Sequence, residues 1–264
     1  MLANRMFLAG SNSQNRNIPI PFDGYLDYGW FGGGSASVST VDRIDYANDT
    51  ATASIRGPLS SGRYSPGATG TSSYGWFGGG ATPTIVTTVD RIDYSNDTAT
   101  ATVRGSLPVT RAYPATTGTS SYGWFGGGYG GDFFSSVDRI DYVNDTAVAS
   151  VRGPLSVTRY IAAATGTSSY GWFAGGYSYS SVDRIEYSND TPTAIVRGNI
   201  SAARYQLAAT GTSTYGWFGG GYGASIVSTV DRIDYSNDTA TASLRGPLSL
   251  ARDRLAATQN SPVN

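Results

Sequence analysis

The residues of this chain that could do chemistry are carboxylates and guanidiniums that recur at a fixed spacing. Five near-copies of "VDRIDY" each place an Asp, an Arg and a second acidic residue close together, as in Asp42, Arg43 and Asp45. Paired carboxylates perform acid and base steps in glycoside hydrolysis, carboxylate clusters bind metals, and Arg clusters bind anions. The same residues in a buried strand can instead pair with each other or with the next repeat, because buried charge needs a partner.

The composition argues against an enzyme. The 264 residues include no Cys, His or Lys, and Glu186 is the single Glu. There is therefore no thiolate nucleophile, no imidazole base and no His ligand for a metal. The Asp residues recur in every copy, whereas catalytic sites normally break internal symmetry, and their spacing does not match an EF-hand loop. We expect a non-enzymatic protein without cofactor or metal, in which the repeated arginines form structural ion pairs: Arg43, Arg91, Arg139, Arg184 and Arg232. The alternative is that the five repeated Arg or Asp residues together line a site for an anion or a metal.

Charge and hydropathy limit the partners. The net charge of −1 gives no electrostatic footprint for nucleic acid. No segment approaches the roughly 20 apolar residues that a membrane helix needs. The N-terminal apolar run, Met6 to Ala9, is too short for a signal peptide, so we expect no export by that route.

The repeat predicts the architecture. Gly-Trp-Phe occurs five times, at intervals of 46, 48, 48 and 45 residues, and "VDRIDY", Asn-Asp-Thr and an alternating stretch such as "ATASIR" follow each copy. Alternation with a period of two predicts strands, and no window has helical periodicity. A period in the mid-forties with Gly and aromatic punctuation is typical of a four-stranded β-propeller blade. The tryptophans that mark the five blades are Trp30, Trp76, Trp124, Trp172 and Trp217.

The order of the segments resembles the kelch repeat. From its second Arg, each unit contains a small-residue strand such as "IAAATG", then "YGWFGGG", "VDRIDY" and a final strand. The amino-acid sequence of the repeat is also similar to that of kelch-like repeat proteins of aquatic bacteriophages, especially cyanophages and pelagiphages, over about residues 25–260. One departure is the Trp, which lies in the fourth strand of a kelch blade and in the second strand here. The resemblance implies a five-bladed kelch-like propeller and a virion protein.

The Trp-Phe-Gly string suits a propeller. Consecutive strand residues point to opposite faces, so Trp and Phe can each serve one interface between blades. The glycines that follow permit backbone conformations closed to other residues. Ala174 replaces the first of the three, so we expect only the later two to need positive φ.

Counting strands predicts a closed ring. The last small-residue strand has no "YGWFGGG" after it, and the first "YGWFGGG", at Tyr28, has no such strand before it. We therefore expect residues 252–260 to pair with the strand near Tyr28 and to remove the free edges of the ring. The arginines that precede the small-residue strands are Arg63, Arg111, Arg159, Arg204 and Arg252.

Each repeat also contains an Asn-Asp-Thr sequence, which is a glycosylation acceptor in secreted eukaryotic proteins. Asn and Asp at a hairpin tip explain the same residues by turn chemistry, and without a signal peptide we favour the turn. These residues are Asn48, Asn96, Asn144, Asn189 and Asn237.

The segment between the glycines and "VDRIDY" varies in length and sequence, and loops on a rigid scaffold commonly carry recognition. Its aromatic residues could stack on a sugar ring or dock a partner protein; alternatively they fold onto the blade edge without function. The candidate binding residues are Tyr129, Phe133, Phe134, Tyr177, Tyr179 and Tyr222.

Residues 1–22 lie outside the repeat, and we expect an extended arm there that binds other virion proteins, with a disordered tail as the alternative. Residues 23–264 form the propeller. We expect a non-enzymatic structural or interaction protein of a bacteriophage virion, in the tail, baseplate or fibre apparatus or on the capsid surface. The alternative is a carbohydrate-binding, lectin-like propeller that attaches virions to host glycans.

Overall fold

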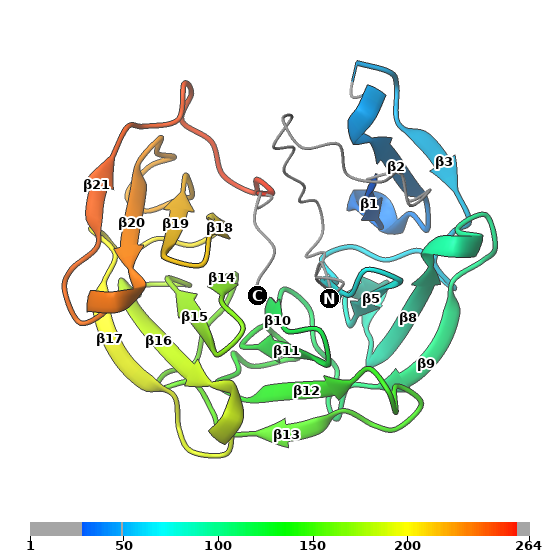
Figure 1. Cartoon of the computed structure of the whole chain (residues 1–264), viewed down its shortest axis with the longest axis horizontal. Coiled ribbons are helices and arrows are strands. Elements are labelled where there is room, and N and C mark those ends of the chain that lie inside the picture. The colour runs from blue at the N-terminus through cyan, green and yellow to red at the C-terminus, as the bar shows by residue number, and fades with distance from the viewer. Residues whose placement is uncertain (1–27, 49, 258–264) are drawn as a thin grey trace, which may run out of the picture.

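Five β-sheets surround a common axis in the computed structural model of the chain (Figure 1). The structure describes residues 28–48 and 50–257. The first of these sheets has three strands and the other four have four, and paired strands are antiparallel throughout. The sheets follow one another around the axis in chain order, so the predicted five-bladed all-β propeller is confirmed.

Each blade runs from the axis outward. The innermost strands are β4 (Gly67–Gly70), β10 (Ala115–Gly118), β14 (Ala163–Gly166) and β18 (Ala208–Gly211). The second strands are β1 (Tyr28–Gly32), β5 (Tyr74–Gly78), β11 (Tyr122–Gly126), β15 (Tyr170–Ala174) and β19 (Tyr215–Gly219). The third strands are β2 (Val41–Asp45), β8 (Thr88–Asp93), β12 (Val137–Asp141), β16 (Ser181–Glu186) and β20 (Val230–Asp234). The outer strands are β3 (Ser54–Arg56), β9 (Thr102–Ser106), β13 (Ser150–Arg152), β17 (Ile195–Asn199) and β21 (Ser243–Arg245).

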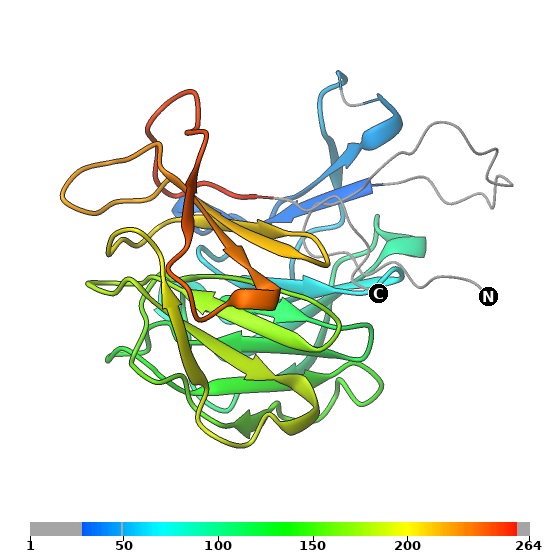
Figure 2. The same ribbon diagram turned by 60° about the vertical axis from the view of Figure 1, so that its left-hand side comes forward.

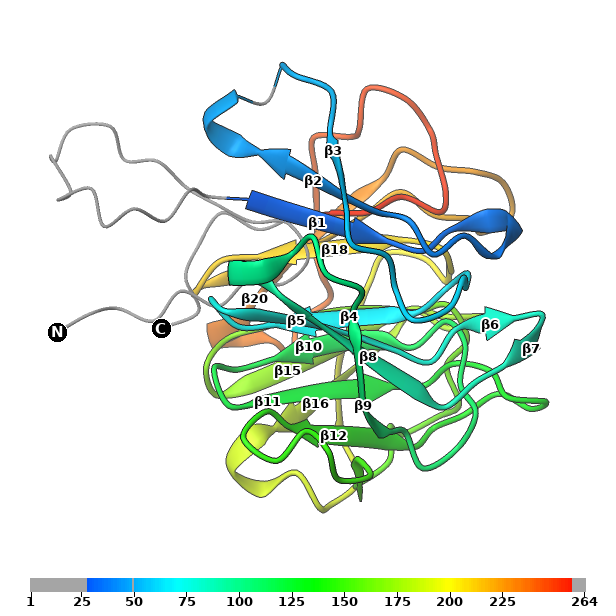
Figure 3. The same ribbon diagram turned by 90° about the vertical axis from the view of Figure 1, so that its right-hand side faces the viewer.

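The two ends of the blades carry different connections (Figures 2 and 3). The variable loops, including the short pair β6 (Ala81–Thr82) and β7 (Thr84–Ile85), lie at one end, which we name the loop face. The 3-10 turns that follow the third strands lie at the opposite end. These turns are η2 (Tyr46–Asn48), η3 (Tyr94–Asn96), η4 (Tyr187–Asn189) and η5 (Tyr235–Asn237), and η1 (Ser35–Ser37) belongs to the first variable loop.

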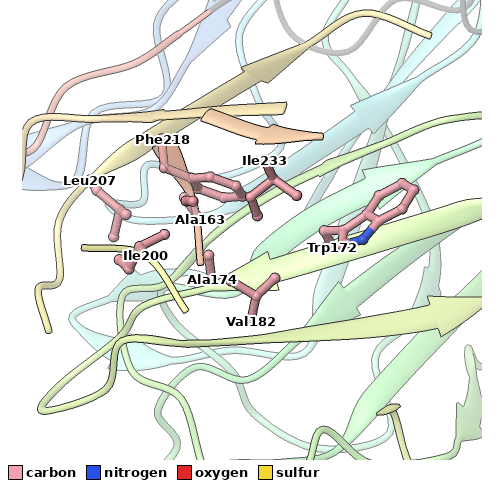
Figure 4. Packing of buried hydrophobic residues seen from close by; sticks show 9 residues of the cluster. Ala163, Trp172, Ala174, Val182, Ile200, Leu207, Phe218 and Ile233 are labelled. Atoms are coloured by element: carbon pink, nitrogen blue, oxygen red, sulfur yellow. The ribbon is translucent and has the colours of Figure 1, made fainter. Parts of the chain in front are cut away.

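Trp and Phe of the second strand face opposite neighbours, as predicted. In blade four the Trp172 indole N–H donates to Asp238 of blade five at 2.9 Å. The Phe173 ring packs on Gly126 of blade three and is fully buried, which contributes about 1.5–3 kcal/mol. Figure 4 shows the corresponding packing of Phe218 against the small residues of blade four. Each repeat therefore supplies one ring to each interface.

The glycines behave as the substitution at Ala174 predicts. In every blade the last two of the three positions have positive φ, for example Gly127 at 67° and Gly128 at 99°, and the first position does not. A Cβ on Gly127 would lie 2.5 Å from the carbonyl oxygen of Arg159. The backbone therefore leaves the second strand by a route that other residues could follow only with strain.

Blade one has no innermost strand among the described residues. No residue of 252–257 is in a strand, and the remainder of the predicted closing segment lies outside the described residues. The Gly221 amide donates to the Arg252 carbonyl at 2.9 Å, as the Gly176 amide donates to the Arg204 carbonyl at 3.0 Å. The chain thus reaches Arg252 by the path that leads into the other innermost strands, and closure by the residues beyond stays a prediction.

The facing sides of blades one and five are less covered than the other interfaces of the described chain. Phe31 is 44% exposed, whereas its four counterparts are at most 5% exposed. A Cβ on Gly246 would meet nothing within 4 Å, whereas one on its counterpart Gly198 would overlap the Ala240 carbonyl. Figure 1 shows β1–β3 and β18–β21 apart at this position.

Candidate functional site

One set of repeated charges lies inside the blades. Arg63 Nη2 is 2.9 Å from Asp90 Oδ2, and neither side chain is exposed. Burial lowers the pKa of Arg63, and the charge of Asp90 opposes that shift. The equivalent buried pairs are Arg111–Asp138, Arg159–Asp183 and Arg204–Asp231. These residues hold the connection into each innermost strand against the third strand of the same blade.

A second set joins consecutive blades. Asp97 of blade two accepts the Trp30 indole N–H at 2.9 Å and Arg43 Nη1 at 3.0 Å, both from blade one. The predicted pairing of this Arg with the next blade is confirmed. Asp45 does not take part, because its carboxylate accepts the Ala47 amide at 2.8 Å instead. The equivalent acceptors are Asp145, Asp190 and Asp238, with Trp76 and Arg91, Trp124 and Arg139, and Trp172 and Arg184 as donors.

The corresponding donor residues of the last blade are Trp217 and Arg232. Trp217 is half-buried, and Arg232 lies over the Tyr215 ring at 4.1 Å. The acceptor expected by analogy is residue 49, which the structure does not describe.

Four tyrosines, two of them buried and two half-buried, complete the interfaces between blades. Tyr142 stacks on Trp76 at 4.1 Å, and its hydroxyl lies 2.6 Å from Thr69 Oγ1. Burial raises the pKa of the Tyr142 phenol, and the Thr69 hydrogen bond opposes that shift. We name Tyr94, Tyr142, Tyr187 and Tyr235 the interblade tyrosines. The repeated polar residues thus stabilise the scaffold. Within residues 28–48 and 50–257, no three acidic side chains are arranged to hold a metal ion.

A continuous row of aromatic rings lies outside these networks. Consecutive ring centroids are 4.9 to 6.4 Å apart, and Phe133 stacks on Tyr160 with an interplanar angle of 12°. The row crosses blades two to five. We name it the aromatic belt: Tyr64, Tyr113, Tyr129, Phe133, Tyr160, Tyr177, Tyr205 and Tyr222.

Short backbone pairings position the belt on the loop face. The residue that follows the glycine pair bonds to the residue that follows the buried Arg, as in Tyr205 and Tyr222, whose amides and carbonyls exchange hydrogen bonds of 3.0 and 2.8 Å. In blade four the Tyr177 amide donates to the Tyr160 carbonyl at 3.1 Å. The variable loops are thereby attached to the entrance of the innermost strands, and their rings meet near the axis.

Four of the six aromatic residues predicted from the variable loops belong to the belt: Tyr129, Phe133, Tyr177 and Tyr222. The other two fold against the scaffold. Phe134 lies 5.0 Å from the guanidinium of buried Arg111, and Tyr179 lies 5.9 Å from that of Arg159. Two of the six therefore pack against buried arginines of the scaffold, and four join one row of rings; whether that row carries recognition stays a prediction.

Sequence reasoning missed the other half of the belt. Tyr64, Tyr160 and Tyr205 directly follow a buried Arg, and Tyr113 is one position further on. Burial raises the pKa of Tyr160, the phenols of Tyr113, Tyr129 and Tyr64 raise it further, and the charge of Arg254 opposes the shift. The signal in the sequence was the Tyr that recurs after the Arg, which is absent from the last copy.

The comparisons with known proteins support the fold. No family model and no curated protein matches the sequence. A solved structure described as "Structure of YjhT" is similar in three dimensions, with a TM-score of 0.72 at 12% identity over 88% of this chain and 84% of that one. At that identity the likeness extends to the fold alone. In the described part of the chain, no helix has the length and hydropathy to cross a membrane.

Proposed function

We propose that this chain is a non-enzymatic recognition protein of a bacteriophage virion and that the aromatic belt is its binding surface. The belt carries the proposal. Three of its rings are well exposed: Phe133 at 41%, Tyr177 at 51% and Tyr222 at 37%. Burying such a ring would contribute about 1.5–3 kcal/mol to folding, so an exposed row of rings is a cost to the free protein. Contiguous exposed apolar surface of this kind marks interaction sites.

The scaffold supports a binding role over catalysis. Its buried carboxylates already accept hydrogen bonds from Arg and Trp, as Asp190 does from Trp124 and Arg139. A carboxylate held in this way is not available to transfer a proton or attack a substrate.

Carbohydrate is the partner that the belt favours. A Tyr ring presents a flat apolar face that can stack on the C–H face of a sugar, and its hydroxyl can exchange hydrogen bonds with sugar hydroxyls. Seven of the eight belt residues are Tyr, so the surface combines both properties along its length. A host-surface glycan fits this chemistry.

The proposal that the chain belongs to a virion rests on the sequence of the repeat, which resembles that of kelch-like proteins of aquatic phages. The tail, baseplate or fibre apparatus is the proposed location, with decoration of the capsid surface as the alternative. Attachment to other virion proteins is assigned to the arm, residues 1–22, which lies outside the described residues.

Adsorption of phage particles tests the binding face. Phe133→Ala combined with Tyr177→Ala should slow adsorption to host cells at least tenfold, because both exposed rings are lost. The control is Val143→Ala combined with Val148→Ala, which changes two exposed residues beyond the third strand of blade three and should leave adsorption unchanged. Equal adsorption by both variants contradicts a role for the belt. Mass spectrometry of purified virions tests the setting, and absence of the chain from them would overturn it.

A further inference from the structure

One position of the repeat differs in every blade. The second residue after the repeated Arg is a hydroxyl, a phenol, an aliphatic, an amide or a guanidinium, depending on the copy. An Arg stands two positions before it and an Ala or Gly two positions after it in all five copies, whereas the residues directly on either side also differ between copies. We name this set the axial arc: Ser65, Tyr113, Ile161, Gln206 and Arg254.

The backbone makes this diversity costly. All five residues have φ between 52° and 59°, in the left-handed region. Ile161 is β-branched, a type that adopts this region least readily. Glycine would fit without strain, and each blade already uses glycine at two other positive-φ positions. None of the five side chains is fully buried: four are half-buried and Arg254 is exposed. Strain of about 1–3 kcal/mol per residue is typical of functional sites.

The arc borders the axis on the loop face. Ser65, Tyr113, Ile161 and Gln206 lie two positions before the innermost strands, which are nearest the centre in Figure 1, and Arg254 is their counterpart in the last copy of the repeat. Backbone hydrogen bonds of 3.0 Å join neighbouring blades through these residues. They run from the Tyr113 amide to the Ser65 carbonyl, from Gln206 to Ile161, and from Arg254 to Gln206.

The arc becomes polar toward blade five, next to the belt. With its amide group turned to suit its neighbours, the Gln206 side chain donates to Asp253 Oδ2 and accepts from Arg254 Nε, each at 2.9 Å. The Gln206 backbone amide donates to the carbonyl of Ile161 at 3.0 Å, and Ile161 directly follows Tyr160, whose ring centroid lies 5.3 Å from that of Tyr113. An amide, a carboxylate and a guanidinium therefore lie next to the segment that carries the Tyr160 ring of the aromatic belt.

We propose that Gln206, Asp253 and Arg254, together with the ring of Tyr160, bind one neutral saccharide unit, so that each propeller has a single carbohydrate site instead of five. The ring stacks on the C–H face of the sugar. Asp253 accepts hydrogen bonds from sugar hydroxyls, Arg254 donates to them, and Gln206 does both. The opposite charges of Asp253 and Arg254 make the site neutral overall, which suits an uncharged sugar better than one that bears a carboxylate or a phosphate.

This inference rests on the proposed glycan binding, and its test separates the two. Methyl glycosides of glucose, galactose, mannose and N-acetylglucosamine, with methyl glucuronide as the acidic probe, are offered to the full chain. Saturation-transfer NMR detects binding, and titration calorimetry with the best binder counts the sites. We expect one site per chain, a preference for a neutral glycoside, and binding at least tenfold weaker in Gln206→Ala and Arg254→Ala.

Matched variants keep the result independent of folding. Ser65→Ala changes the same left-handed position in blade two and should bind like the wild type. Gln206→Asn retains an amide on a residue that tolerates positive φ, yet its shorter side chain should still lose affinity. Several equivalent sites, or binding unchanged in Gln206→Asn and Arg254→Ala, overturn the single axial site and leave glycan binding standing. Absence of binding to every glycoside overturns both.

Discussion

Replacing Asp145 tests whether the interface between blades two and three depends on a buried carboxylate. Asp145 is 3% exposed and accepts the Trp76 indole N–H at 2.9 Å. It also accepts Arg91 Nη1 at 3.0 Å and two N–H groups of Arg104 at 2.8 and 2.6 Å. Asp145→Ala removes all four hydrogen bonds at once.

The cost can be worked from these contacts. The Trp76 N–H is 1% exposed and would lose its acceptor, which costs about 1–3 kcal/mol. Breaking a buried ion pair by removing one partner costs about 3–5 kcal/mol. The lower end applies here because both arginine side chains are 23% exposed and can reach water. We expect a loss of about 4 kcal/mol for Asp145→Ala and about 2 kcal/mol for Asp145→Asn, which keeps an acceptor for Trp76, against a typical total stability of about 5–15 kcal/mol.

Urea unfolding at pH 7, followed by tryptophan fluorescence, measures the difference. The control is Asp141→Ala, which removes an exposed carboxylate in the same blade that accepts the Val143 amide, and its midpoint should stay close to the wild type. If Asp145→Ala unfolds with the wild-type midpoint, apolar packing alone holds the interface and the reasoning is wrong.

Acidification provides a second measurement on the same residue. Burial acts to raise the pKa of Asp145, but hydrogen bonds from Arg104 and Trp76 and the charges of Arg91 and Arg104 outweigh it and lower the pKa. The contribution of Asp145 to stability is therefore present above the unfolded pKa, near 3.9, and is lost as the pH falls through the lower folded pKa. Between about pH 4 and pH 2, Asp145→Asn should lose less stability than the wild type.

Three further predictions follow from the interfaces. Gly127→Ala should cost about 2–3 kcal/mol in urea unfolding, because φ is 67° and the new Cβ would lie 2.5 Å from the Arg159 carbonyl oxygen, whereas the Cβ of Gly246→Ala meets no described residue within 4 Å and should be neutral while the seam between blades one and five is open. Burial raises the pKa values of the interblade tyrosines, so stability should be intact below pH 10 and fall at higher pH, as urea midpoints measured from pH 8 upward would show. If the ring closes as the repeat predicts, a double-mutant cycle on Arg252 and Asp42 should give about 1–3 kcal/mol of coupling, and its absence would mean that the seam stays open.

The architecture was predictable because the rules that encode it are local and are repeated five times. Alternation in "ATASIR" predicts a strand, and a Trp-Phe pair predicts one ring for each neighbouring blade. Ala174 identified the one glycine position that does not need positive φ. Each copy of the repeat is a further test of the same prediction.

The acceptor in the Asn-Asp-Thr turn was not predictable in the same way. Turn chemistry explains the Asn and places the Asp at an exposed tip, yet Asp190 is 5% exposed and accepts from Trp124, 66 residues earlier in the sequence. The register between blades decides this contact, and no pattern within one copy reports it.

Half of the aromatic belt could not be predicted from the sequence, because its residues belong to the repeated part of the blade. A Tyr that directly follows the repeated Arg in three of five copies has the pattern of a scaffold residue, whereas the variable loops have the pattern of a recognition site. Backbone pairing, such as that of Tyr205 with Tyr222, brings the two segments together on the loop face. Only the three-dimensional arrangement shows that loop and scaffold aromatics form one surface.

The fivefold repeat is the reason why the differences among the residues of the axial arc are informative. A scaffold of near-identical blades offers the same groups five times, so a set of equivalent sites would need no variation among the copies. Here all five copies keep the same left-handed backbone conformation while the side chain at that position changes from Ser65 to Arg254. Different side chains on a repeated backbone fit one asymmetric ligand better than several identical ones. If each blade carries the same site, several sugar molecules bind to each chain. If the blades together surround one site, a single sugar molecule binds, so the measured number of bound sugars distinguishes the two arrangements.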